Sequence, residues 1–424
     1  MPEVTPGYME GSLGSTAVDW DARLDMGRLR ATRTKRAQDA VTAAGYDAVL
    51  VLADPNIRYV TSVATSSVSG AGGFHYSLLD ADGAITHWDS ADHAVVQRRS
   101  CPWLTDIRYA APGIGIVPAA LGGGDAADAM LAAMAAEVAA ALDDHGIAAG
   151  RVGLDTAQPG LARLLEARGH TVDFGASAAL ARARAIKSED EIECLRICAA
   201  ICEAGFQAMR ERIEPGIRDN EVWSEAVRRI ISLGGEHAGG KLSSGPDTWP
   251  KSQSDWSDRI IRPGDIVYAD FYNIGYNGYR SCYYRTFSSG PPKRETVDAY
   301  RRAVDNLYGV LDGIRPGVST DEVAARFPDA EAEYWDYYGI RDGWQMTTNH
   351  WGHGIGLQLY EIPLVWRGVS LDHPMTLEEG MTLAVETQDR DGSQGVRVEE
   401  MVVIRAGGVE LLSKWPVEEI TVVA

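Results

Sequence analysis

The chain has 424 residues, of which 45% are hydrophobic and 24% are charged, which is an ordinary composition for a globular protein. Because this length exceeds what one hydrophobic core usually serves, we expect two domains. The formal net charge of −20 argues against nucleic acids and anionic membranes as partners, since their negative surfaces repel an acidic protein.

The first half of the sequence alternates between helical and extended patterns. Residues 22–44 are predicted to form a helix, followed by a strand in YDAVLVLA, and DPNIRYVTSV is expected to form a turn and a second strand. Further predicted elements are a strand in GAITHWD, a helix at 125–142, a strand in RVGLD, a helix in LARLLEARG and a strand in TVDF. This alternation predicts an α/β domain with a largely buried sheet over residues 1–185.

A new pattern begins after residue 185. Ser188 is a candidate N-cap, and the three acidic residues 189–191 suit the first turn of a helix. More helices are predicted in EVWSEAVRRIIS and in RETVDAYRRAVDNLYGVLDGI. Strands are predicted in DIVYADF, GMTLAVETQ and GVRVEEMVVI. We therefore expect a second domain over residues 186–424.

Features of the termini and cysteines predict a cytoplasmic protein. The N-terminus has neither the basic start nor the apolar stretch of a signal peptide, and no apolar run is long enough to span a membrane. The five cysteines cannot all pair within the chain. Cys194, Cys198 and Cys202 recur at helical spacing, which favours a buried helix face over a metal cluster.

Residues 349–363, NHWGHGIGLQLYEIP, form the densest cluster of residue types that build active sites. Histidine is a common metal ligand and proton carrier near neutral pH. Glycines beside His353 permit close approach of backbone or ligand. A hydrogen-bonded core histidine in a glycine-rich turn remains the alternative for this stretch alone.

Carboxylates in three predicted strands point to a metal site. Asp270, Glu386 and either Glu399 or Glu400 lie in otherwise apolar or alternating runs, where a buried charge needs a partner or a metal. In GVRVE, strand alternation places Glu400 on the valine face and Glu399 on the other, so we prefer Glu399. One histidine and three carboxylates are the ligands expected for a divalent cation.

The order of these motifs resembles the pita-bread family, which includes aminopeptidase P, prolidase and creatinase. The resemblance rests on Asp270 and on the motifs HGIGxxxxExP, GMxxxxE and RVE, and it covers residues 186–424. The resemblance implies a creatinase-like α/β N-terminal domain and an α+β catalytic domain in which helices cover a curved antiparallel sheet. It also implies a homodimer that acts on a small-molecule substrate.

The sequence departs from this family at the metal site. Metal-dependent members use two aspartates from one hairpin, then His, Glu and Glu, but the second aspartate position falls at Cys282 or Ser281. Loss of this bridging carboxylate favours one ion over two. Cys282 is then either a thiolate ligand, which favours zinc or iron, or a packed, inert cysteine. The expected ligands of one Zn, Fe or Mn ion are Asp270, Cys282, His353, Glu386 and Glu399.

Two histidines of the peptidase members are also replaced. Gln253 and Tyr360 stand at their positions, and a glutamine cannot act as a general base. We expect Tyr360 to donate a proton, with His353 and Glu386 as the other catalytic residues. A metal-free site, as in creatinase, remains open, with His353 as the base. The residues expected to contact substrate are Gln253, Trp249, Tyr272, His350, Trp351 and Glu361.

These features predict a hydrolase that cleaves a C–N bond in a small, amino-acid-derived substrate. The many Trp and Tyr residues around the predicted ligands would favour a cationic substrate group, although they also serve as packing residues. An alternative is β-elimination, because ARAIKSEDEI and LSSGPDTWP resemble the branch that cleaves dimethylsulfoniopropionate. That branch has carboxylates where this chain has Tyr272 and Tyr360. A third alternative is an inactive homologue that binds a ligand or partner.

Overall fold

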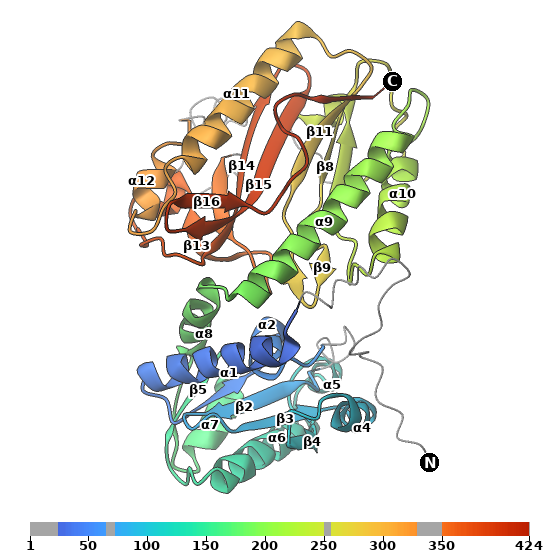
Figure 1. The fold of residues 1–424 in the computed structure, drawn as a ribbon. Coiled ribbons are helices and arrows are strands. Elements are labelled where there is room, and N and C mark those ends of the chain that lie inside the picture. The colour runs from blue at the N-terminus through green and yellow to red at the C-terminus, as the bar shows by residue number, and fades with distance from the viewer. Residues whose placement is uncertain (1–23, 65–72, 250–255, 329–349, 424) are drawn as a thin grey trace. The chain divides into compact units, whose positions relative to one another are not determined.

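The computed structural model describes residues 24–64, 73–249, 256–328 and 350–423. The chain divides into two compact units, Met1–Arg184 and Ala185–Ala424 (Figure 1). Each unit has its own sheets, helices and buried apolar residues, so each is described by itself.

The N-terminal unit is built on a six-stranded mixed sheet with the strand order β4-β3-β2-β1-β5-β6. β1 pairs antiparallel with β2 and parallel with β5, and all four of its residues, AVLV, are buried. A continuous apolar run is typical of a strand covered on both faces. The strands are β1 (Ala48–Val51), β2 (Tyr76–Asp80), β3 (Ile85–Asp89), β4 (Asp106–Tyr109), β5 (Arg151–Leu154) and β6 (Thr171–Asp173).

Helices of this unit pack their apolar stripes against the sheet. In α6, Met134, Val138 and Leu142 recur every fourth residue and join the same core as Leu50 and Leu78 of the strands. The helices are α1 (Met26–Ala43), α2 (Asp54–Thr61), α4 (Ala91–Ser100), α5 (Ile116–Ala120), α6 (Asp125–Asp144), α7 (Pro159–Glu166) and α8 (Ala176–Ala185).

The predicted strand in DPNIRYVTSV is wrong, because Asp54–Thr61 forms the helix α2. Pro55 lies in the first turn, where its missing N–H costs nothing and its fixed φ suits a helix. Ile57 and Val60 are both buried and are spaced as neighbours on one helix face. The run IRYV misleads because a short apolar run fits both a strand and a buried helix.

The C-terminal unit contains a four-stranded sheet, β17-β11-β8-β7, and a five-stranded sheet, β13-β12-β14-β15-β16. The strand pairs in both sheets are antiparallel except for the parallel pair of β11 and β17. The strands are β7 (Lys241–Ser244), β8 (Ile266–Asp270), β9 (Gly275–Tyr276), β10 (Tyr279–Arg280), β11 (Tyr284–Ser289), β12 (Trp351–Gly354), β13 (Glu361–Val365), β14 (Thr382–Arg390), β15 (Gly395–Arg405), β16 (Gly408–Leu411) and β17 (Thr421–Val423).

Helices cover these sheets (Figure 1). α11 (Arg294–Leu311) lies along β14 and β15, and its residues Ala303 and Leu307 share a core with Val385 and Val398. The other helices are α9 (Glu189–Arg212), α10 (Asp219–Ser232), η2 (Gly245–Thr248), α12 (Thr320–Ala324) and α14 (Arg367–Ser370).

The start of α9 agrees with the sequence prediction. Ser188 is its N-cap, the Ser188 N–H donates to the Glu191 carboxylate at 2.8 Å, and the Ser188 hydroxyl accepts from the Glu191 N–H. Cys194, Cys198 and Cys202 are all buried on this helix, which confirms their assignment to its packed face.

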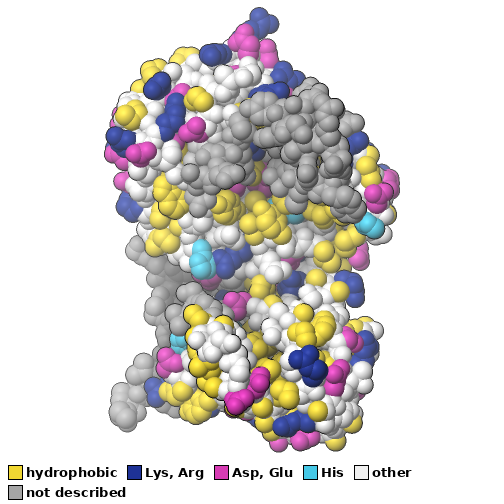
Figure 2. All heavy atoms as spheres, turned by 180° about the vertical axis from the view of Figure 1, so that it is seen from behind, with side chains coloured by type: hydrophobic (Ala, Val, Ile, Leu, Met, Phe, Trp, Pro, Cys, Tyr) yellow, Lys and Arg dark blue, Asp and Glu magenta, His cyan; other side chains and the backbone are white. Residues whose placement is uncertain are grey.

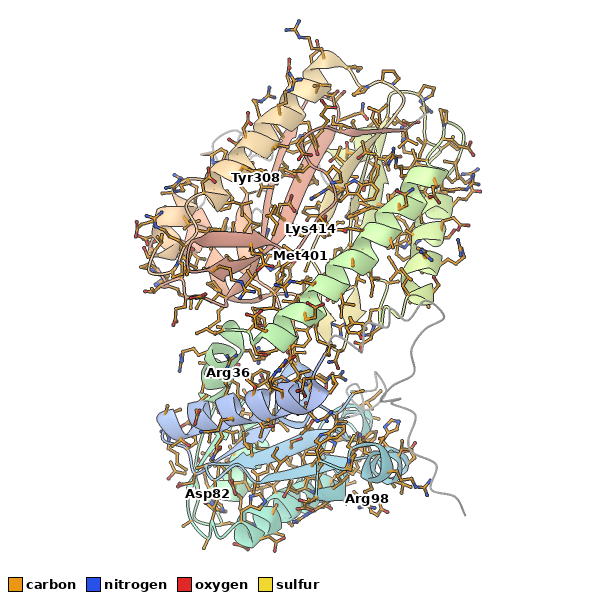
Figure 3. All side chains as sticks on the ribbon, in the orientation of Figure 1. Arg36, Asp82, Arg98, Tyr308, Met401 and Lys414 are labelled. Atoms are coloured by element: carbon orange, nitrogen blue, oxygen red, sulfur yellow. The ribbon has the colours of Figure 1, made fainter. Side chains whose placement is uncertain are left out.

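Side chains join the two sheets of the C-terminal unit at β11 and β15. The Thr286 hydroxyl donates to the Arg397 carbonyl at 2.7 Å and accepts from the Arg397 N–H at 3.0 Å. The Arg285 guanidinium donates to the Glu400 carboxylate at 2.9 Å. Tyr308 of α11, labelled in Figure 3, donates to the same carboxylate at 3.3 Å. These bonds fix the position of β15, which carries one of the predicted ligands.

The surface carries interspersed charges of both signs on the face seen in Figure 2. Among the described residues, no helix combines the length and apolar character that crossing a membrane requires.

Candidate metal centre

Strand register in the five-stranded sheet sets one half of the site. Trp351 of β12 lies opposite Glu386 of β14, which lies opposite Glu399 of β15. Residues opposite each other on antiparallel strands point to the same face. His353 follows Trp351 by two residues and therefore shares this face, opposite Ala384.

The hairpin of β8 and β11 supplies the other half. Asp270 lies opposite Tyr284, and the hydrogen bond from the Phe271 N–H to the Tyr283 carbonyl at 3.0 Å continues the pairing beyond the strands. Cys282 lies two residues before Tyr284, so alternation gives both side chains the same face as Asp270.

Cys282, His353 and Glu399 meet where the two halves come together. One ligand atom from each lies within 4.8 Å of the other two, and all three residues are buried. Burial and then the charges of Glu399, Asp270 and Glu386 raise the pKa of the Cys282 thiol well above its ordinary value. The three predicted carboxylates therefore all lie close enough to the thiol to affect its ionisation.

His353 presents one ring nitrogen to this group. Its Nδ1 lies 3.0 Å from the Gly354 carbonyl, which only a protonated Nδ1 can hydrogen-bond. Its Nε2 is buried and makes no hydrogen bond to any described residue. Burial lowers the pKa of His353 to about 4. A neutral imidazole whose Nδ1–H is held by a backbone carbonyl is the usual form of a histidine metal ligand.

The residues present fit one divalent cation. Burying several acidic groups together is costly, and a cation at their centre offsets that cost. Thiolate, imidazole and carboxylate together suit zinc or iron better than magnesium or calcium, which prefer oxygen ligands.

An aromatic group borders the site. The ring of His353 lies 4.9 Å from that of Trp351 and 4.7 Å from that of Tyr360, between centroids. Trp351 is buried, whereas Tyr360 is 56% exposed and forms the outer edge. Desolvation raises the pKa of Tyr360, and the nearby Cys282 and Glu386 raise it further. The Tyr360 hydroxyl therefore keeps its proton at neutral pH.

The other predicted substrate contacts have different surroundings. The Glu361 carboxylate accepts from Lys187 Nζ at 2.9 Å, and both side chains are buried, so Glu361 already has an ion-pair partner. The Trp249 ring is buried, and the Arg390 guanidinium lies over it, 5.2 Å from the ring centroid. Arg390 is the last residue of β14. Tyr272 is half-buried in the segment that follows β8. Gln253 lies outside the described residues.

His350 lies just before β12 and is half-buried. Burial lowers its pKa to about 4, and the nearby Arg397 adds to this effect while Asp389 opposes it. Its Nδ1 is buried without a hydrogen bond to any described residue.

We expect His350 to make the protein less stable in acid. Its pKa is about 4 in the folded chain and about 6.5 in an unfolded chain, so the unfolded state binds more protons between these values. Stability is therefore fully present above pH 6.5 and is lost as the pH falls to 4, by at most about 3 kcal/mol from this group. Urea unfolding at several pH values should show a smaller loss for His350→Gln; an equal loss would contradict this assignment.

Three residues around the site are absent from the predicted site residues. Tyr284 is buried opposite Asp270, and Arg397 lies on the same face of β15 as Glu399, 5.1 Å from the Tyr268 ring. Strand alternation from Cys282 and Glu399 was a usable signal for both. Lys187 precedes a helix start and carried no signal, because its partner Glu361 is distant in sequence.

Two family models match the chain. The model described as metallopeptidase family M24 matches residues 193–406, and the model of the creatinase/prolidase N-terminal domain matches residues 33–186.

Known proteins are similar over different shares of the chain. A dimethylsulfoniopropionate lyase DddP of Roseobacter denitrificans is 28% identical over 92% of this chain and 87% of its own length. A probable dipeptidase PepE of Mycobacterium tuberculosis is 31% identical over 57% of this chain and 62% of its own length.

Solved structures share the fold. A dipeptidase from Pyrococcus horikoshii has a TM-score of 0.71 at 20% identity, covering 92% of this chain and 99% of that chain. An Xaa-Pro dipeptidase from Bacillus anthracis has a TM-score of 0.69 at 21% identity, covering 93% and 99%. Together with the family models, these structures confirm the predicted fold class, an α/β domain followed by an α+β domain of the pita-bread type.

Proposed function

Because the chain belongs to metallopeptidase family M24, we propose that its C-terminal unit is a single-ion hydrolase that cleaves a C–N bond in a small, amino-acid-derived substrate. The observation that carries this proposal is the buried meeting of Cys282, His353 and Glu399 from two different sheets. A cysteine at a position where the family resemblance implies a bridging carboxylate favours one ion over two.

Five residues would hold the ion: Asp270, Cys282, His353, Glu386 and Glu399. When bound, a zinc or iron ion supplies Lewis acidity, which polarises a carbonyl oxygen and makes water more acidic. The protein supplies a dry, acidic setting in which the Nδ1–H of His353 is fixed by the Gly354 carbonyl.

Tyr360 is the proposed proton donor to the leaving nitrogen. Its hydroxyl is protonated at neutral pH because its pKa is raised, and its ring touches His353 at the exposed edge of the site. General acid catalysis from such a position typically contributes about 10²- to 10⁴-fold in rate. Trp351 and Tyr360, whose centroids are 5.3 Å apart, offer aromatic faces to a cationic substrate group, worth roughly 0.5–2 kcal/mol each.

Elimination from a sulfonium compound is the second candidate function. It is favoured by the similarity to a dimethylsulfoniopropionate lyase, which extends over 92% of this chain. Elimination needs a base, and a tyrosine with a raised pKa is a poor one at neutral pH. Hydrolysis therefore ranks first.

A product assay separates these functions. Protein grown with added zinc, iron or manganese is incubated with dipeptides, small cationic amides and dimethylsulfoniopropionate. We expect release of a free amine, with loss of turnover after chelation and recovery with one equivalent of metal. Release of dimethyl sulfide and acrylate would instead establish elimination. Turnover that resists chelation would establish a metal-free site, and no turnover of any compound would favour a binding homologue.

Replacing Tyr360 with phenylalanine should lower kcat by about 10²- to 10⁴-fold with little change in KM, because the ring is kept and only the hydroxyl is lost. Steady-state kinetics on the substrate identified by the product assay measures this change. Tyr109→Phe is a matched control, since Tyr109 is similarly exposed and lies in the other unit. An unchanged kcat for Tyr360→Phe would remove this residue from the reaction.

A further inference from the structure

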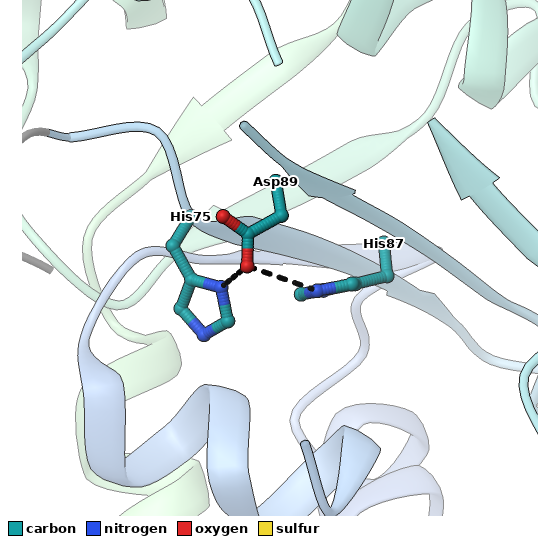
Figure 4. A group of neighbouring side chains, drawn as sticks. All are labelled: His75, His87 and Asp89. Carbon is teal, nitrogen blue, oxygen red and sulfur yellow. Dashed lines mark hydrogen bonds and ion pairs between the residues drawn. The ribbon is translucent and has the colours of Figure 1, made fainter. Parts of the chain in front are cut away.

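The N-terminal unit contains a second group of metal-ligand side chains, made of His75, His87 and Asp89 (Figure 4). All three residues are buried, and one ligand atom from each lies within 4.8 Å of the other two. The group lies wholly within the unit Met1–Arg184, so a role for it is independent of the function proposed for the C-terminal unit.

Strand pairing explains why these side chains meet. Ser77 of β2 lies opposite His87 of β3. His75 precedes Ser77 by two residues, and Asp89 follows His87 by two, so strand alternation places all four on one face of the sheet. A His-x-Ser segment beside a His-x-Asp segment therefore places a compact polar group on one face of the sheet.

The distances suit a small cation. His75 Nδ1 is 2.9 Å from Asp89 Oδ2, and His87 Nε2 is 4.0 Å from the same oxygen. In a tetrahedral zinc site with bonds of about 2.0–2.2 Å, neighbouring ligand atoms are roughly 3.3–3.6 Å apart. The two distances lie on either side of this range, so shifts of a few tenths of an ångström would bring these atoms to bonding positions.

His87 carries the strongest evidence for a ligand. Its Nδ1 lies 2.8 Å from the Ser77 hydroxyl, whereas its Nε2 is buried, faces Asp89 and lies close to the Gln97 side chain. In the tautomer in which Nδ1–H donates to the Ser77 hydroxyl, the lone pair of Nε2 is free to bind a cation placed between it and the Asp89 carboxylate.

A purely structural hydrogen-bond network is the competing interpretation. Asp89 accepts from Gln97 Nε2 and from the Ser90 N–H, each at 2.7 Å, which ties β3 to α4. Those bonds account for Asp89, and contact of Gln97 with His87 would extend the same network, so the metal-binding test below must separate the two interpretations. A metal-binding histidine is usually oriented by an acceptor for its other ring N–H, and the Ser77 hydroxyl is placed to be that acceptor for His87.

We propose that His75, His87 and Asp89 bind one divalent transition-metal ion, with zinc the best match. Two imidazoles and one carboxylate favour zinc over magnesium or calcium, which select oxygen ligands. His93, whose Nδ1 lies 3.5 Å from Asp89 Oδ1, is placed to supply the fourth ligand of a tetrahedral site.

Zinc counting with variants is the first test. The full chain and its His353→Ala variant are each compared with the same protein carrying His87→Ala, by equilibrium dialysis against Zn²⁺ and elemental analysis. We expect His87→Ala to remove one equivalent of zinc in both backgrounds. His170→Ala is the matched control, because His170 is also buried in this unit but accepts a backbone N–H and lies outside the ligand group. Equal zinc content with and without His87 would overturn the proposal.

A milder variant separates ligation from folding. Ser77→Ala keeps all three ligands and removes only the hydroxyl that orients His87, so we expect zinc affinity to weaken about 10- to 100-fold. Unchanged affinity at this site would contradict the assigned orientation of His87.

Hydrogen exchange tests zinc binding on the chain without any substitution. Adding Zn²⁺ should slow amide exchange in the segment from β2 to β3, Tyr76–Asp89, whereas Mg²⁺ should not. Exchange in this segment that does not respond to Zn²⁺ would overturn the proposal, whatever happens at the C-terminal centre.

Discussion

Replacing Arg285 with methionine is expected to lower the free energy of unfolding of the C-terminal unit by about 3–5 kcal/mol. The Arg285 and Glu400 side chains are only 1% and 2% exposed, and they are 2.9 Å apart. Removing the guanidinium leaves a buried carboxylate without its countercharge, and it also removes the bonds from Arg285 to the Trp415 and Glu399 carbonyls. Urea unfolding followed by tryptophan fluorescence measures this loss.

Two variants control this experiment. The double variant Arg285→Met with Glu400→Met should recover most of the loss, because replacing both members of a buried pair with apolar groups is often close to neutral. Arg302→Met breaks the more exposed pair of Arg302 and Asp389, so it should cost less than about 1 kcal/mol. A loss below about 1 kcal/mol for Arg285→Met would show that the buried pair is not what fixes β15 against β11.

Replacing His353 with alanine should weaken metal binding at the C-terminal centre by at least about 100-fold and reduce turnover to background. Removing a direct ligand costs more than removing a group that only orients one, for which about 10- to 100-fold is typical. Zinc titration against a competing chelator measures the change. For the zinc titration, His350→Ala is the matched control from the same stretch of sequence, since the Nδ1 of His350 is also buried but His350 lies outside the ligand group. Equal affinity in the His353→Ala variant would exclude this histidine as a ligand.

Much of the fold could be predicted from local patterns. The capped start of α9 and the strands that carry Glu386 and Glu399 follow from residue spacing and lie at the predicted positions. The error at α2 arises in the run IRYV, which is too short to distinguish helical from extended structure. Long periodic segments give correct predictions because many residues point to the same answer.

The candidate site could be predicted only in part. Alternation along β15 indicates that Glu399 and Glu400 face opposite ways, and the structure pairs Glu400 with Arg285 while Glu399 lies near Cys282 and His353. Sequence could not show which strands of the two sheets approach each other, since this depends on tertiary packing. For the same reason sequence patterns do not reveal the ion pair that Lys187 forms with Glu361, a residue predicted to contact substrate.

The division of the predicted ligands between two sheets also bears on how the chain folds. Asp270 and Cys282 lie in one hairpin, whereas His353, Glu386 and Glu399 arrive later in the sequence on another sheet. During synthesis the ligand set is completed only when β15 has emerged and docked, which requires contacts between distant parts of the chain and is therefore slow. A metal ion that binds the complete set shifts the equilibrium toward the docked state by mass action. Metal supply during expression should accordingly decide the yield of folded protein, and not only its activity.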